Sequence, residues 1–387
     1  MEFKIVKKST KSRARVGILK TSHGEIETPA LVPVATQAVV KTLTSEEAEA
    51  TGCQILIANT FHLHLKPGED IVKNAGGLHK FMNWQRPLMT DSGGYQVFSL
   101  GFGKDMQVGK VLKFFPGGEE QKVSVGSKPK SLTIGWNGVY FKSPLDGSKI
   151  FIGPKESIAI QEKLGADIIF AFDECTPPLS TFEYAKQALE RTHRWAKICL
   201  EVKKSKPASA PDGQALFGIV QGSKYKELRE ESAKFVNSQG FDGFGIGGDL
   251  GSSKADMQEI LDWVLPDLDE RKPRHLLGIG YLEDMEMIIK NGIDLFDCTV
   301  PTHYARHGVA FTAGGKLHLE NKNFLKDKEP LDKNCKCMVC QTYKRNYISH
   351  LVRAKEMTAS KLLTFHNLYY FNNFVSKIRE RIKNSEI

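Results

Sequence analysis

Three cysteines and one histidine towards the end of the chain have the residue types and spacing of a metal site. Cys335, Cys337 and Cys340 form the pattern C-x-C-x2-C, and His366 follows 26 residues after the last cysteine. Three thiolates and one imidazole are a tetrahedral ligand set for a closed structural zinc site. His350 lies nearer to the cysteines and competes with His366 on spacing alone. The pattern predicts one structural Zn2+ ion, with no open coordination position for catalysis.

Two aspartates are candidates for catalytic carboxylates. Asp91 opens the string D-S-G-G-Y-Q, and Asp297 lies within F-D-C-T-V-P-T. Paired carboxylates in a cleft can displace a group at an anomeric carbon, one as the nucleophile and the other as acid or base. The chain has 45 acidic residues, so the pairing needs a fold that brings these two together.

Alternating strand and helix patterns predict that fold. Eight short apolar segments end in polar or glycine-rich turns, at 30–34, 54–58, 87–90, 167–172, 216–220, 241–246, 275–279 and 294–296. Helical periodicity covers 154–164, 182–203, 223–238, 254–264 and 282–290, and Thr44 with Glu47 forms a capping box. Eight alternating strands predict an α/β fold, a (β/α)8 TIM barrel with a zinc-binding subdomain; a doubly wound open sheet is the alternative.

We expect residues 1–387 to form one barrel unit. Residues 101–153 are a long insertion with a hairpin around Asp146-Gly147, and 104–130 read as a surface loop. The zinc-binding subdomain is expected at 325–370. Carboxylates and glycines follow most predicted strands, at 59–62, 91–96, 173–175, 221–222, 247–249, 280–281 and 297–298. Because active sites of such barrels lie at the carboxyl ends of the strands, we expect the site there.

Composition narrows the class of protein. The net charge of +9 suits a polyanionic partner such as nucleic acid. A soluble basic protein without such a partner explains the charge equally well. Seven cysteines, three of them within six residues, do not resemble a disulfide framework. The chain has no apolar run long enough for a transmembrane helix, and its first 20 residues lack the apolar region of a secretory signal. A cytoplasmic protein without membrane association is therefore expected.

The motifs together resemble the tRNA-guanine transglycosylase family. The matching segments are 12–15 with 28–29, 59–63, 67–68, 76–79, 91–98, 172–176, 218–223, 240–248, 273–280, 294–298, 301–302 and the cysteine motif. The string D-S-G-G-Y-Q-V-F-S-L and the cysteines are highly specific in combination. The resemblance implies exchange of the wobble guanine in tRNAs with G-U-N anticodons for a 7-deazaguanine, in queuosine biosynthesis. It also implies a zinc-bearing barrel, a homodimer, and His366 as the fourth ligand.

The resemblance also implies roles for individual residues. Asp297 matches the nucleophile that attacks ribose C1′ and forms a covalent RNA–enzyme link, and Asp91 matches the general acid/base. Base binding is expected from Asp91, Ser92, Gly93, Gly94, Tyr95, Asp173, Gln221, Gly247 and Gly248. RNA contact is expected from Gly278, Ile279, Gly280, Tyr281, Leu282, Glu283, Asp284, Thr302, His303, Tyr304, Ala305 and Arg306.

Cys175 fits the D-E-C-T-P pattern of bacterial members of the family. Three other positions depart from the bacterial sequences. His303 stands where common bacterial members carry arginine, Gly251 replaces a valine near the base 7-substituent, and Ser253 replaces a glutamate. The lost volume at Gly251 favours the hypothesis that the pocket accepts queuine beside or instead of 7-aminomethyl-7-deazaguanine (preQ1). The alternative functions are a non-catalytic RNA-binding subunit of the same fold and an ordinary glycosidase.

Overall fold

The structure is a computed structural model that describes residues 1–98, 132–177, 180–205, 213–251 and 253–387. The predicted loop at 104–130 lies outside these residues. No helix within the described ranges is long and apolar enough to cross a membrane.

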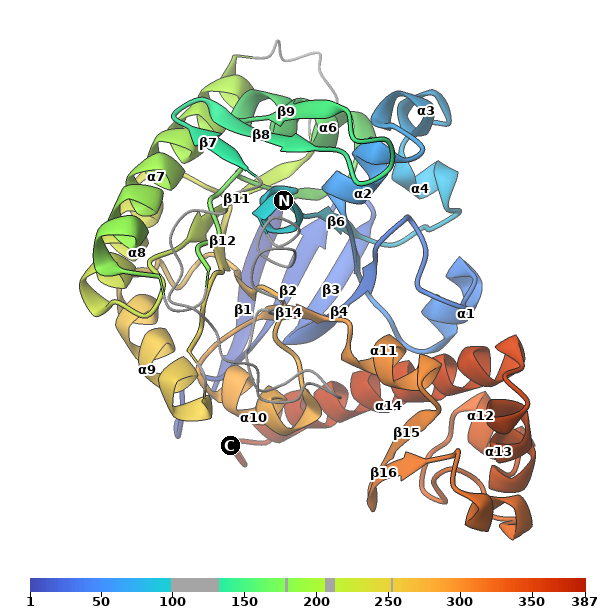
Figure 1. Cartoon of the computed structure of the whole chain (residues 1–387). Coiled ribbons are helices and arrows are strands. Elements are labelled where there is room, and N and C mark those ends of the chain that lie inside the picture. The colour runs from blue at the N-terminus through green and yellow to red at the C-terminus, as the bar shows by residue number, and fades with distance from the viewer. Residues whose placement is uncertain (99–131, 178–179, 206–212, 252) are drawn as a thin grey trace.

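Eight parallel strands close into a barrel (Figure 1). They are β4 (Ala30–Ala35), β5 (Leu56–Ala58), β6 (Leu88–Thr90), β10 (Ile168–Phe170), β11 (Ala215–Val220), β12 (Gly243–Ile246), β13 (Arg274–Leu276) and β14 (Leu295–Cys298). Pairing of Ile168 with Met89 joins β10 to β6, and β14 pairs with β4. The eight predicted strands and the TIM barrel are therefore confirmed, and the open-sheet alternative is wrong.

Helices surround the barrel and follow the strands in chain order. They are α1 (Ser45–Ala50), α2 (Thr60–Leu65), α3 (Glu69–Asn74), α4 (Leu78–Phe81), α6 (Pro154–Leu164), α7 (Phe182–Lys204), α8 (Lys226–Ser238), α9 (Lys254–Val264), η1 (Leu265–Asp267), α10 (Leu282–Lys290) and α11 (Val300–Arg306). The five predicted helices and the Thr44–Glu47 capping box are present. Helix α8 begins after the predicted Ser223, because Ser223 has a φ of 52° that a right-handed helix cannot include.

A three-stranded antiparallel sheet that we did not predict covers the amino-terminal end of the barrel. It consists of β1 (Glu2–Lys8), β2 (Arg15–Thr21) and β3 (Gly24–Thr28). Leu19 and Ile26 extend the hydrophobic cluster that fills the barrel interior. The buried guanidinium of Arg15 lies 2.6 Å from the carboxylate of Asp294, just before β14. Because this sheet closes the amino-terminal end of the barrel, a ligand site is expected at the carboxyl ends of the strands.

The insertion between β6 and β10 contains a small sheet of β7 (Thr133–Gly135), β8 (Gly138–Lys142) and β9 (Lys149–Ile152). Strands β8 and β9 pair antiparallel on either side of Asp146-Gly147, which confirms the predicted hairpin.

The C-terminal part lies beside the barrel and is joined to it by one long helix (Figure 1). It comprises β15 (Val309–Thr312), β16 (Gly315–His318), η2 (Lys322–Lys326), α12 (Met338–Thr342), α13 (Arg345–Arg353) and α14 (Met357–Lys383). The cysteines of this part share a hydrophobic cluster with barrel strand residues such as Leu56 and Leu88. Near the end of α14, Arg379 donates to the carboxylate of Glu27 and to the carbonyl of Pro29.

Candidate active site and metal centre

A pocket of about 390 Å³ opens at the carboxyl ends of the barrel strands. This volume lies within the roughly 300–1,000 Å³ typical of small-molecule sites. Of the predicted site residues, Asp91, Ser92, Tyr95, Asp173, Gln221, Gly247, Gly248, Gly278, Ile279, Tyr281, Asp297, His303 and Tyr304 line it. The others, Gly93, Gly94, Gly280, Leu282, Glu283, Asp284, Thr302, Ala305 and Arg306, belong to the same segments. The fold thus brings both candidate carboxylates into one cavity.

Asp91 follows β6 and is held by four donors. Its Oδ1 accepts from the backbone N–H of Thr60 at 2.9 Å and of Gly93 at 3.2 Å. Its Oδ2 accepts from the side-chain amides of Asn59 and, at 2.6 Å, Gln96. Burial raises the pKa of Asp91 above its ordinary value, and these hydrogen bonds only partly oppose the shift. A carboxyl group of this kind can take and return a proton nearer to neutral pH than an exposed aspartate can.

Asp173 and Gln221 form a connected pair on the pocket wall. Asp173 follows β10, and its two oxygens accept from Ser92 Oγ at 2.8 Å and Gln221 Nε2 at 2.6 Å. The buried Oε1 of Gln221 has no hydrogen-bond partner among the described residues. An unsatisfied acceptor facing a cavity is available to an N–H donor of a ligand. As oriented here, Gln221 offers an acceptor, since Asp173 already takes its N–H.

The loop after β12 brings backbone close to this pair. Gly248 has a φ of 81°, and a Cβ there would lie 2.2 Å from Gln221 Oε1, so only glycine fits. Arg229 of α8 is fully buried and donates to the carbonyl oxygens of Gly247 at 2.8 Å and Asp249 at 2.6 Å. Burial lowers the pKa of Arg229 to about 10, so its guanidinium remains charged at neutral pH. The guanidinium of Arg229 therefore holds the backbone of this loop in place from the α8 side.

Asp297, at the end of β14, lies across the barrel mouth from the loop after β6. Its Oδ1 accepts from the backbone N–H of Gly278 at 2.9 Å and lies 2.9 Å from Nε2 of His275. The side chain is 14% exposed, which leaves it accessible from the pocket. A carboxylate that is accessible from a cavity can act as a nucleophile.

Aromatic side chains form the outer rim of the pocket. Tyr281, just before α10, and His303 and Tyr304, on α11, all line it. The ring of His303 lies 4.4 Å from that of His307, centroid to centroid. Burial, together with the charges of His307 and Arg306, lowers the pKa of His303, so this imidazole is neutral at physiological pH. The rim position held by His303 therefore offers a planar ring rather than a positive charge.

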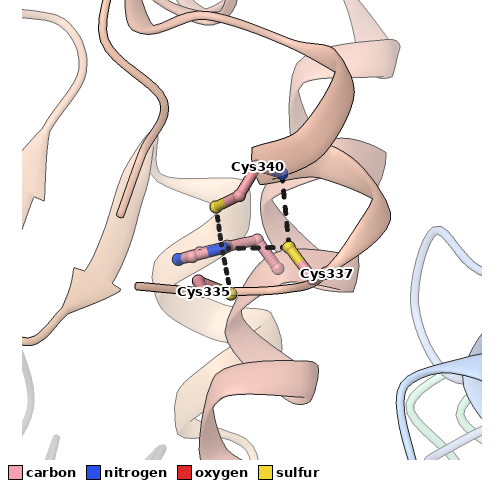
Figure 2. Close-up of side chains that lie close together, drawn as sticks. Cys335, Cys337 and Cys340 are labelled. Carbon is pink, nitrogen blue, oxygen red and sulfur yellow. Dashed lines mark hydrogen bonds between the residues drawn. The ribbon is translucent and has the colours of Figure 1, made fainter. Parts of the chain in front are cut away.

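Cys335, Cys337, Cys340 and His366 form one buried cluster that can hold a metal ion. Figure 2 shows the three cysteine side chains close together. The three sulfur atoms lie 3.8, 3.4 and 3.3 Å from His366 Nδ1. A tetrahedral zinc with ordinary bond lengths separates its sulfur and nitrogen ligands by roughly 3.5 Å, so the donor set fits. The Nε2–H of His366 donates to the carbonyl of Phe311 at 2.8 Å, which leaves Nδ1 as the ligand atom. The competing His350 is exposed on α13, and it is His366 that the fold brings to the three cysteines.

A second group that can hold a metal, His23, His79 and Asp167, lies near the amino-terminal end of the barrel. Its two rings stack with centroids 3.5 Å apart and planes 14° from parallel. Imidazole lone pairs lie in the ring plane, so two nearly parallel rings do not point at one ion between them. Asp167 also accepts from Ser22 Oγ and the N–H of Leu88. These contacts describe a hydrogen-bonded cluster that ties the N-terminal sheet to β10.

Comparison with known proteins identifies the family of this chain. The model of the family described as queuine tRNA-ribosyltransferase matches residues 9–387. The chain belongs to this family. Proteins named queuine tRNA-ribosyltransferase from Halothermothrix orenii and Natranaerobius thermophilus are each 44% identical to it, over 99% of this chain and 94% and 95% of their own lengths. An Archaeoglobus fulgidus protein is 46% identical over 99% of this chain and 96% of its own length. The resemblance seen in the sequence motifs is confirmed.

The prediction that Gly251 widens the base pocket is wrong for this chain. Gly251 lines a smaller separate cavity, together with Ile279 and Tyr281, rather than the main pocket. Its φ is 84°, and a Cβ there would lie 2.2 Å from Cβ of Asp256. Glycine is thus required by the loop backbone, and the inference of lost side-chain volume was wrong.

Three residues that support the site in this family member were missing from the predicted set. Asn59 and His275 contact the two carboxylates, and Arg229 holds the Gly247–Gly248 loop. Arg229 occupies a buried position of an amphipathic helix, where an apolar residue is expected, and that mismatch was the available signal. His275 lies between Arg274 and Leu276 in a buried strand, where a polar side chain is a similar signal.

We predict that the purified protein contains one metal ion per chain at the cysteine cluster. His366→Ala removes a ligand, so metal affinity should fall by more than the roughly 10–100-fold that loss of an outer partner costs. Elemental analysis after dialysis against a weak chelator measures this. His350→Ala is the matched control and should keep its metal; equal loss in both variants would contradict the assignment of His366.

Proposed function

We propose that this protein replaces the wobble guanine of tRNAs with G-U-N anticodons by a 7-deazaguanine, as a tRNA-guanine transglycosylase of queuosine biosynthesis. The observation that carries the proposal is that Asp91 and Asp297, from opposite parts of a chain matched by the family over residues 9–387, line one pocket. Two carboxylates at one cavity suit a double displacement at an anomeric carbon.

In the first displacement, the Asp297 carboxylate attacks ribose C1′ of the target nucleotide. The C1′–N9 bond breaks, its electron pair leaves with guanine, which takes up a proton from solvent, and a covalent RNA–enzyme ester forms. In the second, N9 of the incoming base attacks C1′, the ester bond breaks, and its electron pair returns to Asp297. Asp91 takes the proton that the incoming base loses. Two inversions retain configuration at C1′.

The pocket wall supports recognition of a guanine-like base. Asp173 can accept from the adjacent N1–H and 2-amino groups, and the unsatisfied Gln221 Oε1 can accept a further base N–H. The backbone at Gly247 and Gly248 lies close enough to donate or accept along the base edge, and Tyr95 offers a ring for stacking. Ser92, Gly93 and Gly94 form the turn after Asp91, in which the Gly93 N–H donates to Asp91 and the Ser92 hydroxyl donates to Asp173.

The rim supports contact with single-stranded RNA. A base within an anticodon loop must leave its stack to enter the pocket, and proteins hold such bases by stacking on aromatic side chains. The predicted segments at 278–284 and 302–306 supply Tyr281, Tyr304 and the neutral His303 at the mouth. Arg306 and the net charge of +9 favour the phosphate backbone of tRNA.

We propose that the metal is a structural zinc ion. Three thiolates with one imidazole form the closed ligand set that zinc favours, and all four side chains are buried. The cluster lies in the C-terminal part, away from the pocket, so the ion would stabilise this subdomain and take no part in the exchange. Assignment of 325–370 as the zinc-binding subdomain stays a prediction.

A homodimer is the proposed assembly. Large apolar side chains are exposed around the zinc-binding part, among them Met338 on α12, Tyr347 on α13 and Met357 at the start of α14, the last 87% exposed. These exposed apolar groups are available to an association surface on this part of the chain. The molecular mass in solution tests the proposal.

Incubating the protein with tRNA and radiolabelled guanine tests the function. Exchange should occur, and RNA–protein adducts should be trapped on denaturation. Asp297→Ala should abolish the adduct and lower exchange by about 10⁴-fold or more, because no other group forms the bond. The control is Asp262→Ala, a half-exposed acid away from the pocket. RNA binding without any exchange by the wild-type protein would favour the non-catalytic alternative.

The raised pKa of Asp91 predicts the acid side of the pH profile. Asp91 must be ionised to take a proton from the incoming base, so exchange should fall as pH drops through a pKa above the ordinary value of about 3.9. Gln96→Leu removes a donor that favours the ionised form, and should move the acid limb to still higher pH. Rates at saturating tRNA across pH give the result; a limb that moves downwards would disprove this role.

Competition among guanine, preQ1 and queuine tests the base preference. Because Gly251 does not widen the main pocket, queuine use stays a hypothesis without that support, and we expect preQ1 to compete at least as well as queuine. Incorporation of each labelled base into tRNA measures the order. Exclusive use of queuine would show that the pocket differs in the bound state. Removal of the metal should lower stability and tRNA binding and leave this order unchanged.

A further inference from the structure

His275 lies in the middle of β13, directly behind the Asp297 carboxylate. Its side chain is completely buried, and its Nε2 lies 2.9 Å from Asp297 Oδ1. It is absent from the residues that line the pocket, so a base or ribose in the cavity would not touch it. The ring is held edge-on to Phe170, with centroids 5.5 Å apart. His275 can therefore influence the reaction only through Asp297.

The polar contacts of this histidine are one-sided. Nε2 must carry the hydrogen, since a carboxylate oxygen accepts. The other ring nitrogen, Nδ1, is buried and has no hydrogen-bond partner in the part of the chain that the structure describes. Buried polar atoms in folded proteins are nearly always paired, so a histidine kept for structure alone would be expected to use both nitrogens. Among the residues that the structure describes, the one polar contact of the His275 ring is its hydrogen bond to Asp297, the proposed nucleophile.

A second donor meets the same oxygen. The backbone N–H of Gly278 lies 2.9 Å from Asp297 Oδ1, so a side chain from within β13 and a main-chain group from just beyond it converge on one atom. Two donors on one oxygen fix the rotation of the carboxylate about its Cβ–Cγ bond. The plane in which Asp297 presents itself to C1′ is thereby set before substrate binds, which lowers the cost of reaching the attacking geometry.

We propose that His275 is a positioning residue that orients Asp297 and stabilises its charge when it leaves C1′. This inference rests on the proposed function. In the covalent intermediate, Oδ1 is the carbonyl oxygen of the ester, which carries less negative charge than a carboxylate oxygen and accepts a weaker hydrogen bond. As the ester bond breaks and its electron pair returns to Asp297, the full negative charge reappears and the Nε2–H bond strengthens. No proton moves between the two residues.

Two substitutions separate this role from packing. His275→Gln keeps an N–H donor at about the position of Nε2, and His275→Leu has similar bulk with no donor. His275→Phe is a second donor-free variant that keeps a planar ring, in case leucine disturbs the barrel. Thermal unfolding shows that each variant is folded. The readouts are kcat and KM for guanine, and the single-turnover rates at which the RNA–protein adduct forms and breaks down.

We expect the donor-free variants to lower kcat by about 10–100-fold, with adduct breakdown slowed most. KM for guanine should stay within about twofold, because His275 lies outside the pocket lining, and His275→Gln should recover most of kcat. Wild-type rates in a folded His275→Leu variant, or equal losses in the glutamine and leucine variants, would overturn the inference. Wild-type protein that exchanges no guanine would refute the proposed function itself.

Discussion

The hydrogen bonds between β6 and β10 close the parallel sheet, and the arrangement of the site depends on that closure. Parallel strands that meet around a ring place all of their carboxyl ends at one rim, whatever their separation along the chain. Asp91 follows β6 and Asp297 ends β14, and these strands are three places apart in the barrel, with β4 and β5 between them. The insertion that carries β7 to β9 lies between β6 and β10 in sequence, yet the two strands still pair. Closure of the barrel places residues that are distant in sequence around one cavity.

Each carboxylate in the cavity is supported by donors that offset the cost of its burial. An ionised group removed from water is costly unless hydrogen bonds replace its hydration. Asp91 receives four donors and still has a raised pKa, Asp173 is engaged at both oxygens, and Asp297 is held at Oδ1 by two groups. The wall is also braced from outside, because Arg229 binds the carbonyl groups of the loop after β12. Three acids of the same chemistry thus acquire different roles from their surroundings.

Local patterns were sufficient for the barrel and insufficient for its supports. The eight strands, five helices and the cysteine motif could be predicted because apolar periodicity and ligand spacing are properties of short segments. The N-terminal sheet was missed because four of the seven residues of β1 are charged, so its apolar signal is weak. Arg229 and His275 were missed for a related reason, since a buried polar residue is explained by contacts from distant strands. Gly251 was misread because its left-handed backbone, and the nearby Asp256, are visible only in three dimensions.

The long helix α14 joins the two ends of the chain. Its first half carries His366 in the metal cluster, while Arg379 in its last turns binds Glu27 and Pro29, and Lys11 donates to the carbonyl of Glu386. A ribosome makes the N-terminal sheet long before the helix that covers it. The closed end of the barrel therefore completes its packing only once α14 has been synthesised and can fold back onto that sheet.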